Sequence, residues 1–131
     1  MAKHEDMSGI PEKPRGLYIY DRRTGPLIIL DNQLKTSPRL HKCVLAEEIG
    51  HFYTVPRISI LKAYTSTNQR IIQCQDELKA LKWATDFLIP DTELIKALKA
   101  GSQTRYELAE WFDVTEDFIC QKLAILSLNA Y

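Results

Sequence analysis

Apolar residues first gather in two short runs, Leu17 to Tyr20 and Leu27 to Leu30. The stretch between them contains Gly25 and Pro26, which favour a turn, so the pattern predicts a β-hairpin. The second run is apolar at every position, which is typical of a strand covered on both faces. Residues 1–16 carry prolines, glycine and mixed charges without periodicity, and we expect them to form a flexible arm.

Further along the chain, apolar residues recur at every third or fourth position, which is the spacing of amphipathic helices. Ser37 followed by Pro38 is a typical helix start, and Pro56 must end this first helix. A second long helix should end before Pro90, because the residue before a proline is disfavoured in a helix. Gly101 is the residue expected just after a third helix. The helices expected after the first cover residues 70–88, 93–100, 104–112 and 115–128.

Length and composition limit the fold class. A chain of 131 residues that is 45% apolar and 26% charged has the size and composition of one soluble domain. We expect an α+β fold in which a small antiparallel sheet packs on the first two helices, followed by a helical C-terminal part. After the flexible arm, residues 17–131 should form this single domain.

The charge balance and the cysteines indicate which classes of partner are disfavoured and in which cellular compartment the protein is expected. Seventeen basic residues balance seventeen acidic ones, so no net field favours nucleic acid or an anionic membrane. Three widely spaced cysteines fit a reducing compartment better than a disulfide framework. The chain has neither an apolar run long enough to span a membrane nor the apolar core of a signal peptide. These features predict a cytoplasmic protein.

The segment LAEEIGHFYT, residues 45–54, differs by one residue from a zinc-peptidase helix. In the motif H-E-x-x-H, two histidines one turn apart bind zinc, and the glutamate beside the first activates the bound water. Here Glu47 stands in place of the first histidine, while Glu48 and His51 keep the other two positions. A carboxylate also binds zinc, and positions four apart share one helical face. Glu47 and His51 are therefore candidate metal ligands, and Glu48 is the candidate general base.

A catalytic zinc site needs a third protein ligand, and the expected second helix offers Glu77. Taken alone, a glutamate on an amphipathic helix is more often a solvated surface charge. Glu77, however, begins the pattern E-x-x-A-x-x-W-A-x-x-F-L-x-P. With LAEEIGH before it, this pattern resembles the ImmA/IrrE family of metallopeptidases, over about residues 17–126.

The resemblance implies roles for four residues: His51 and Glu77 match zinc ligands, Glu48 matches the general base, and Glu47 stands where the family has its first histidine. Because Glu47 adds a second anionic oxygen ligand, manganese is the alternative to zinc. The implied function is metal-dependent endoproteolysis of a helix-turn-helix repressor, which relieves the repression of a prophage or mobile element.

Two other functions stay open. If Glu47 marks the loss of the metal, the chain is a catalytically silent adaptor that binds such a repressor without cutting it. Alternatively, residues 103–128 look like a helix-turn-helix and suggest a DNA-binding regulator. The second helix of that motif begins with Glu116 and Asp117 and has Lys122 as its only basic residue, whereas DNA contact needs basic side chains. We therefore expect these helices to be either part of the peptidase fold or a protein-docking surface. We expect no direct contact with nucleic acid and no effect of Lys122→Ala on a repressor-dependent phenotype.

Other side chains near the motif have structural explanations. His41 lies about 15 Å from His51 along an ideal helix, too far to bind the same ion, and is expected at the surface. Cys43 is about 12 Å from His51 and is expected to be a small buried residue. Tyr53 and Tyr64 are the candidates for stabilising the oxyanion of the reaction.

Overall fold

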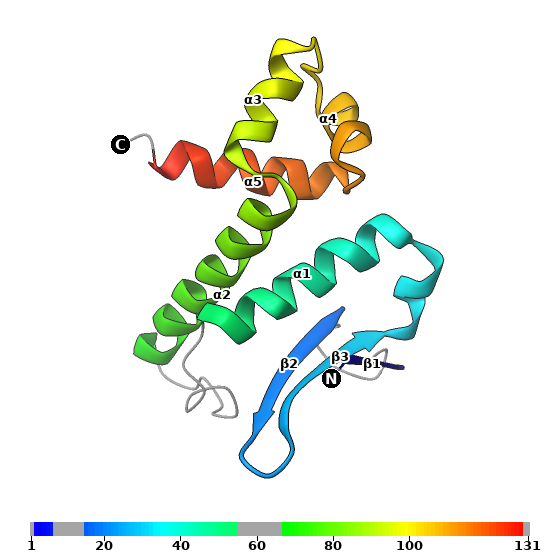
Figure 1. The fold of residues 1–131 in the computed structure, drawn as a ribbon. Coiled ribbons are helices and arrows are strands. Elements are labelled where there is room, and N and C mark those ends of the chain that lie inside the picture. The colour runs from blue at the N-terminus through cyan, green and yellow to red at the C-terminus, as the bar shows by residue number, and fades with distance from the viewer. Residues whose placement is uncertain (1, 7–14, 55–66, 130–131) are drawn as a thin grey trace.

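The computed structural model describes residues 2–6, 15–54 and 67–129, and the side chains of these except 67–74 and 129. It confirms the α+β class: a three-stranded sheet, two long helices and three shorter helices make up the described part (Figure 1). The elements are β1 (Ala2–Glu5), β2 (Gly16–Asp21), β3 (Gly25–Asp31), the 3-10 helix η1 (Asn32–Thr36), α1 (Pro38–Thr54), α2 (Thr67–Leu88), α3 (Asp91–Lys99), α4 (Arg105–Phe112) and α5 (Glu116–Asn129).

The sheet has the strand order β1-β3-β2. Strands β2 and β3 form the predicted antiparallel hairpin, with Tyr18 opposite Ile28 and with Gly25 at a φ of 82° after the turn. Strand β1 runs parallel to β3, so the sheet is mixed rather than purely antiparallel. Ala2–Glu5 thus forms a strand within the region expected to be a flexible arm, and residues 7–14 of that region lie outside the described part.

One face of the sheet packs against α1, and no described helix covers the opposite face (Figure 1). Ile28 and Leu30 of β3 are buried in the cluster beneath α1, whereas Leu27 and Ile29 are only half-buried. Among the described residues, a helix therefore covers this strand on one face only. Side chains of a strand alternate between faces, so an apolar run does not by itself show that both faces are covered.

Helices α1 and α2 approach each other closely at Gly50. A Cβ atom on Gly50 would lie 2.3 Å from the carbonyl oxygen of Ala80, so this contact requires glycine. Ala46 and Ala84 belong to the same region of the core and are small and buried. The close approach brings the LAEEIGH segment of α1 beside the part of α2 that contains Glu77.

The C-terminal helices share a core with α1 and α2. Val114, Phe118 and Ile119 are at most 1% exposed and belong to this cluster. The Thr115 hydroxyl caps α5 by accepting a hydrogen bond of 3.1 Å from the Phe118 amide. Gly101 has a φ of 103° after α3, as predicted for the residue that ends that helix. None of the described helices is both long and apolar enough to cross a membrane.

Helix α5 contains a buried cation. Lys122 is 1% exposed, and its Nζ donates hydrogen bonds to Asp86 Oδ1 at 2.8 Å and to Asp91 Oδ1 at 2.6 Å. The two carboxylates offset the cost of burying the ammonium group. Lys122 therefore links α5 to the end of α2 and the start of α3, and it is not the surface cation that a helix-turn-helix would need.

Candidate metal centre

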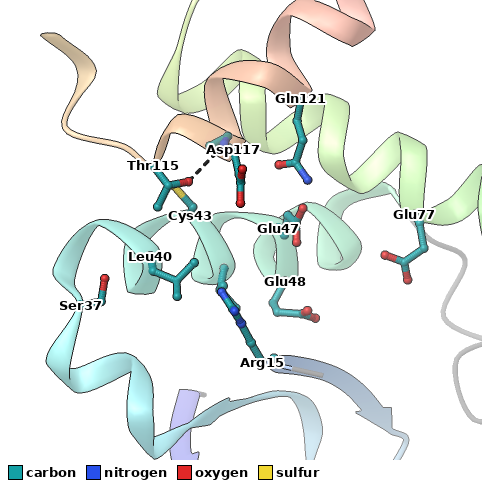
Figure 2. A pocket seen from close by; sticks show the side chains of 13 residues that line it. Arg15, Ser37, Leu40, Cys43, Glu47, Glu48, Glu77, Thr115, Asp117 and Gln121 are labelled. Atoms are coloured by element: carbon teal, nitrogen blue, oxygen red, sulfur yellow. Dashed lines mark hydrogen bonds between the residues drawn. The ribbon is translucent and has the colours of Figure 1, made fainter. Parts of the chain in front are cut away.

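A pocket of about 630 Å³ lies over α1, flanked by β2 and α5. Figure 2 shows the side chains that line it: Glu47 and Glu48 from α1, Glu77 from α2, Arg15 beside the start of β2, and Asp117 and Gln121 from α5. Three of the four predicted site residues therefore face one cavity.

The fourth predicted residue, His51, joins the two motif helices. Its Nε2 lies 3.2 Å from Oε2 of Glu77, a residue 26 positions away in the chain. Burial opposes protonation of His51, but the hydrogen bond to Glu77 and the neighbouring carboxylates outweigh it and raise the His51 pKa. Glu77 is 61% exposed, so this contact is what ties an otherwise solvated glutamate to the site.

Glu47 lines the pocket one helical turn before His51. Burial raises the pKa of its carboxylate, the nearby Glu77 raises it further, and His51 lowers it. A cation between these side chains favours their ionised forms and relieves the repulsion between the carboxylates. Two carboxylates and an imidazole are suitable ligands for zinc, and the two oxygen ligands also suit manganese.

The metal-binding geometry itself is not formed. In the part of the chain that the structure describes, no three His, Cys, Asp or Glu side chains are grouped so that they could hold a metal ion. His51 lies within hydrogen-bond distance of Glu77, whereas Glu47 interacts with both residues through charge alone. The three residues fit a metal ion by their chemistry and their helical positions, and binding requires their side chains to converge.

Glu48 is buried beside this set. The residue is 7% exposed, and its Oε2 has no hydrogen-bond partner. Burial is the main cause that raises its pKa to about 7; His51 lowers the value, and the charges of Glu77 and Glu47 raise it. A carboxyl group with a pKa near neutrality can take up and release a proton under physiological conditions. Glu48 therefore has the protonation behaviour expected of a general base.

The position of Glu48 depends on Gly16 at the start of β2. A Cβ atom on Gly16 would lie 2.8 Å from Val44 Cγ1, 3.0 Å from Glu48 Cγ and 3.1 Å from Glu48 Oε1. The Arg15 carbonyl next to it accepts a hydrogen bond of 2.9 Å from the Asp31 amide, which fixes the strand at this point. Sequence analysis missed Gly16, because a glycine before a strand gives no sign that a side chain packs against it.

Of the two tyrosines considered as oxyanion donors, only Tyr53 is described, and it does not line the pocket over α1. Tyr53 stacks on Trp83 with ring centroids 5.1 Å apart and lines a separate apolar pocket that also contains Phe87. Tyr64 lies outside the described residues. No oxyanion donor is therefore assigned from these predictions.

Of the other two residues near the motif, one behaves as predicted. Cys43 is buried, although its side chain also reaches the pocket, and burial is the main cause that raises its pKa. His41 is half-buried rather than at the surface, and its Nε2 lies 2.9 Å from Nε2 of His4. This pair links β1 to α1, a contact that could not be predicted while residues 1–16 were expected to be flexible.

Comparison with known proteins gives one match. Residues 9–124 match the model of the Peptidase_M78 family, which is described as the IrrE N-terminal-like domain. Neither the curated proteins nor the solved structures contain a match to the chain. The matched region includes the hairpin, both motif helices and most of the C-terminal helices, and it confirms the resemblance seen in the motifs. The chain therefore belongs to the Peptidase_M78 family of IrrE N-terminal-like domains.

Proposed function

We propose that this protein is a metal-dependent endopeptidase. The observation that supports this most directly is Glu48, whose buried and unpartnered carboxylate with a pKa of about 7 faces the same pocket as Glu47 and Glu77. Membership of a peptidase family agrees with this chemistry. The proposed ligands are Glu47, His51 and Glu77, with zinc as the metal and manganese as the alternative.

Each residue of the site has a distinct role in the proposed reaction. When bound, the ion supplies polarisation of the scissile carbonyl and a lowered pKa for the attacking water. Glu48 takes the proton of that water at its free Oε2 and returns it to the leaving amine. His51 and Glu77, whose Nε2 and Oε2 atoms lie 3.2 Å apart, would hold the ion from α1 and α2. Burial of Glu48 keeps competing water away from its carboxylate.

The proposed substrate is a cytoplasmic helix-turn-helix repressor of a prophage or mobile element. This part of the proposal rests on the resemblance of the two motifs to ImmA/IrrE peptidases. A direct role in DNA binding is disfavoured, because Lys122, the only basic residue of α5, is buried against Asp86 and Asp91. The proposed partner is therefore a protein and not nucleic acid.

The test separates the base from the ligands. Glu48→Gln should abolish cleavage of a co-expressed repressor encoded beside the gene while it leaves the zinc content of the purified protein nearly intact. His51→Ala and Glu77→Ala should lose both properties. Glu116→Gln, which removes a carboxylate on the exposed start of α5, is the control and should cleave normally. Full cleavage by Glu48→Gln would show that the assigned mechanism is wrong.

One observation favours a second function. Because the described residues contain no assembled group of metal ligands, the chain could act as an adaptor that binds a repressor without cutting it. Metal analysis of protein purified without chelator distinguishes the two functions. A protein without bound zinc or manganese that still binds the repressor is an adaptor.

A further inference from the structure

The walls of the pocket over α1 carry opposite charges. Arg15, beside the start of β2, is the only cation among the described residues that line the pocket. Asp117 comes from the first turn of α5 on the other wall. Figure 2 shows the two side chains projecting into the pocket from opposite sides of α1. The pocket is thus electrostatically asymmetric across its width.

Neither charge is neutralised by a direct partner. On α1, Arg39 forms ion pairs with Glu110 at 3.0 Å and with Asp113 at 2.9 Å, whereas Arg15 has no ion-pair partner in the described part of the protein. Asp117 also lacks one, and it acts on Arg105 by electrostatic attraction without a contact. Both groups are exposed and available to a ligand.

The helix dipole does not explain the place of Asp117. A carboxylate in the first turn of a helix is stabilised by the dipole, but Glu116 meets that condition equally well and does not line the pocket. An independent feature points to a ligand in the same cavity. Glu48 lines the pocket and is only 7% exposed, and its Oε2 has no hydrogen-bond partner.

The length of the pocket suits an extended segment. Ser37 and Glu47 both line it and are ten positions apart along the chain, which corresponds to about 15 Å of helix. An extended peptide advances about 3.3 Å per residue, so roughly four or five residues fit over α1. Successive side chains of an extended peptide point to opposite sides. Adjacent residues of such a segment would therefore face the β2 wall and the α5 wall.

We propose that the pocket selects an extended substrate segment in which neighbouring residues carry opposite charges, the acidic one facing Arg15 and the basic one facing Asp117. The identification of this segment as a substrate rests on the proposed peptidase function. Pairs at such exposed positions contribute little affinity each, so the charges act mainly on the choice and orientation of the segment.

The experiment measures how short peptides bind to zinc-loaded Glu48→Gln protein by fluorescence anisotropy. The labelled peptides share one serine and alanine background and carry Lys-Glu, Glu-Lys, Lys-Gln, Gln-Glu or Gln-Gln at their centre. In the Glu48→Gln protein, Arg15→Gln and Asp117→Asn are compared with two control substitutions, Arg22→Gln and Glu116→Gln. The controls remove charges of the same sign at exposed positions outside the pocket. We expect Asp117→Asn to weaken binding of lysine-containing peptides roughly two- to fivefold at low salt and to leave Gln-Glu unaffected. Arg15→Gln should weaken the binding of glutamate-containing peptides by a similar factor and leave the binding of the Lys-Gln peptide unaffected.

Several outcomes would overturn the inference: no binding of any peptide, equal losses for charged and neutral peptides, or equal losses in the two control variants. Cleavage is measured separately with the zinc-loaded wild-type protein on the tightest-binding peptide. Charge-selective binding without cleavage would contradict the proposed peptidase function and leave the docking inference standing. Cleavage without charge selectivity would support the proposed peptidase function and contradict the docking inference.

Discussion

Gly50 and Ala80 set the distance between the two halves of the candidate metal centre, because a Cβ atom on Gly50 would lie 2.3 Å from the Ala80 carbonyl oxygen. His51 follows Gly50 on α1, and Glu77 lies about one turn before Ala80 on α2. The backbone contact therefore places His51 Nε2 within 3.2 Å of Glu77 Oε2. Packing of the two helices and assembly of the site depend on the same glycine.

Gly50→Ala should consequently damage stability and metal binding together. Alanine has the higher intrinsic helix propensity, by about 1 kcal/mol, but its methyl group forces α1 and α2 apart. Overpacking of this kind costs about 1–3 kcal/mol. After the gain in helix propensity is subtracted, we expect the free energy of unfolding in urea to fall by up to about 2 kcal/mol. Zinc titration should show weaker binding. Lys79→Ala, at an exposed position next to Ala80, is the control, and equal stability of both variants would contradict the described packing.

Glu48 should make the stability of the metal-free protein fall as the pH rises. Its pKa is raised to about 7 in the folded protein, mainly by burial. Below its ordinary pKa of about 4.5, the group is protonated in both the folded and the unfolded states. Between these two pKa values, Glu48 is ionised in the unfolded chain but keeps its proton in the folded protein. The folded state therefore loses stability until the pH passes about 7.

Comparison with Glu48→Gln measures this effect together with the coupling of Glu48 to Glu47 and His51, which titrate in both proteins. The variant should equal the wild type near pH 4 and exceed its free energy of unfolding by on the order of 2–3 kcal/mol near pH 8. Urea unfolding of the metal-free proteins at several pH values is the measurement. A difference that stays constant with pH would mean that the Glu48 carboxyl group is not buried as described.

Local signals were sufficient to predict most of the helical framework. Pro38, Pro90 and Gly101 restrict the backbone at their own positions, so the helix ends that they mark could be located from the sequence. Strand β1 could not be predicted in this way. Its residues, Ala2–Glu5, are mostly polar, and they form a strand only through long-range pairing with β3.

In the candidate site, too, residues that belong to local motifs could be predicted, whereas those brought in by long-range packing could not. Motif spacing predicted Glu48 and His51 as site residues, and the family pattern was needed to propose Glu77, which by itself resembles a surface charge. Arg15 and Asp117 belong to no motif, and only the packing of β2 and α5 around α1 brings them to one pocket. A sequence pattern can predict candidate ligands that share a helix, but it does not reveal which distant side chains form the walls around them.

Because Lys122 is buried, Lys122→Ala is no longer expected to be without effect. It should destabilise the protein by about 2–4 kcal/mol, because it leaves a cavity and removes the cation between Asp86 and Asp91. The two carboxylates are 45% and 63% exposed, so water relieves part of their repulsion and the loss lies below that of a fully buried pair. Lys82→Ala is the matched control: Lys82 pairs with the same Asp86 at 2.9 Å but is half-exposed. We expect a loss of less than about 1 kcal/mol for the control. Equal effects in urea unfolding would contradict the burial of Lys122.

Glu47 should weaken the preference for zinc. With Glu47, His51 and Glu77 as ligands, a divalent ion is formally neutralised by two carboxylates, whereas a histidine in place of Glu47 would leave a net positive charge. A neutralised ion polarises its water less, and the added oxygen ligand favours harder ions such as manganese. We therefore expect modest zinc affinity and slow cleavage for the wild type, tighter zinc retention for Glu47→His, and almost complete loss of metal for Glu47→Ala.

Titration of these three proteins with zinc and manganese decides whether Glu47 is a ligand. Glu110→Ala, which removes a carboxylate on α4 outside the pocket, is the control and should bind metal like the wild type. Burial raises the pKa of Glu47 in the metal-free protein. In the pH range where part of this carboxylate is protonated, metal binding through it should release more protons in wild type than in Glu47→Ala. Equal zinc affinity and equal proton release in those two proteins would show that Glu47 is not a ligand, and the adaptor would then be the better description of this chain.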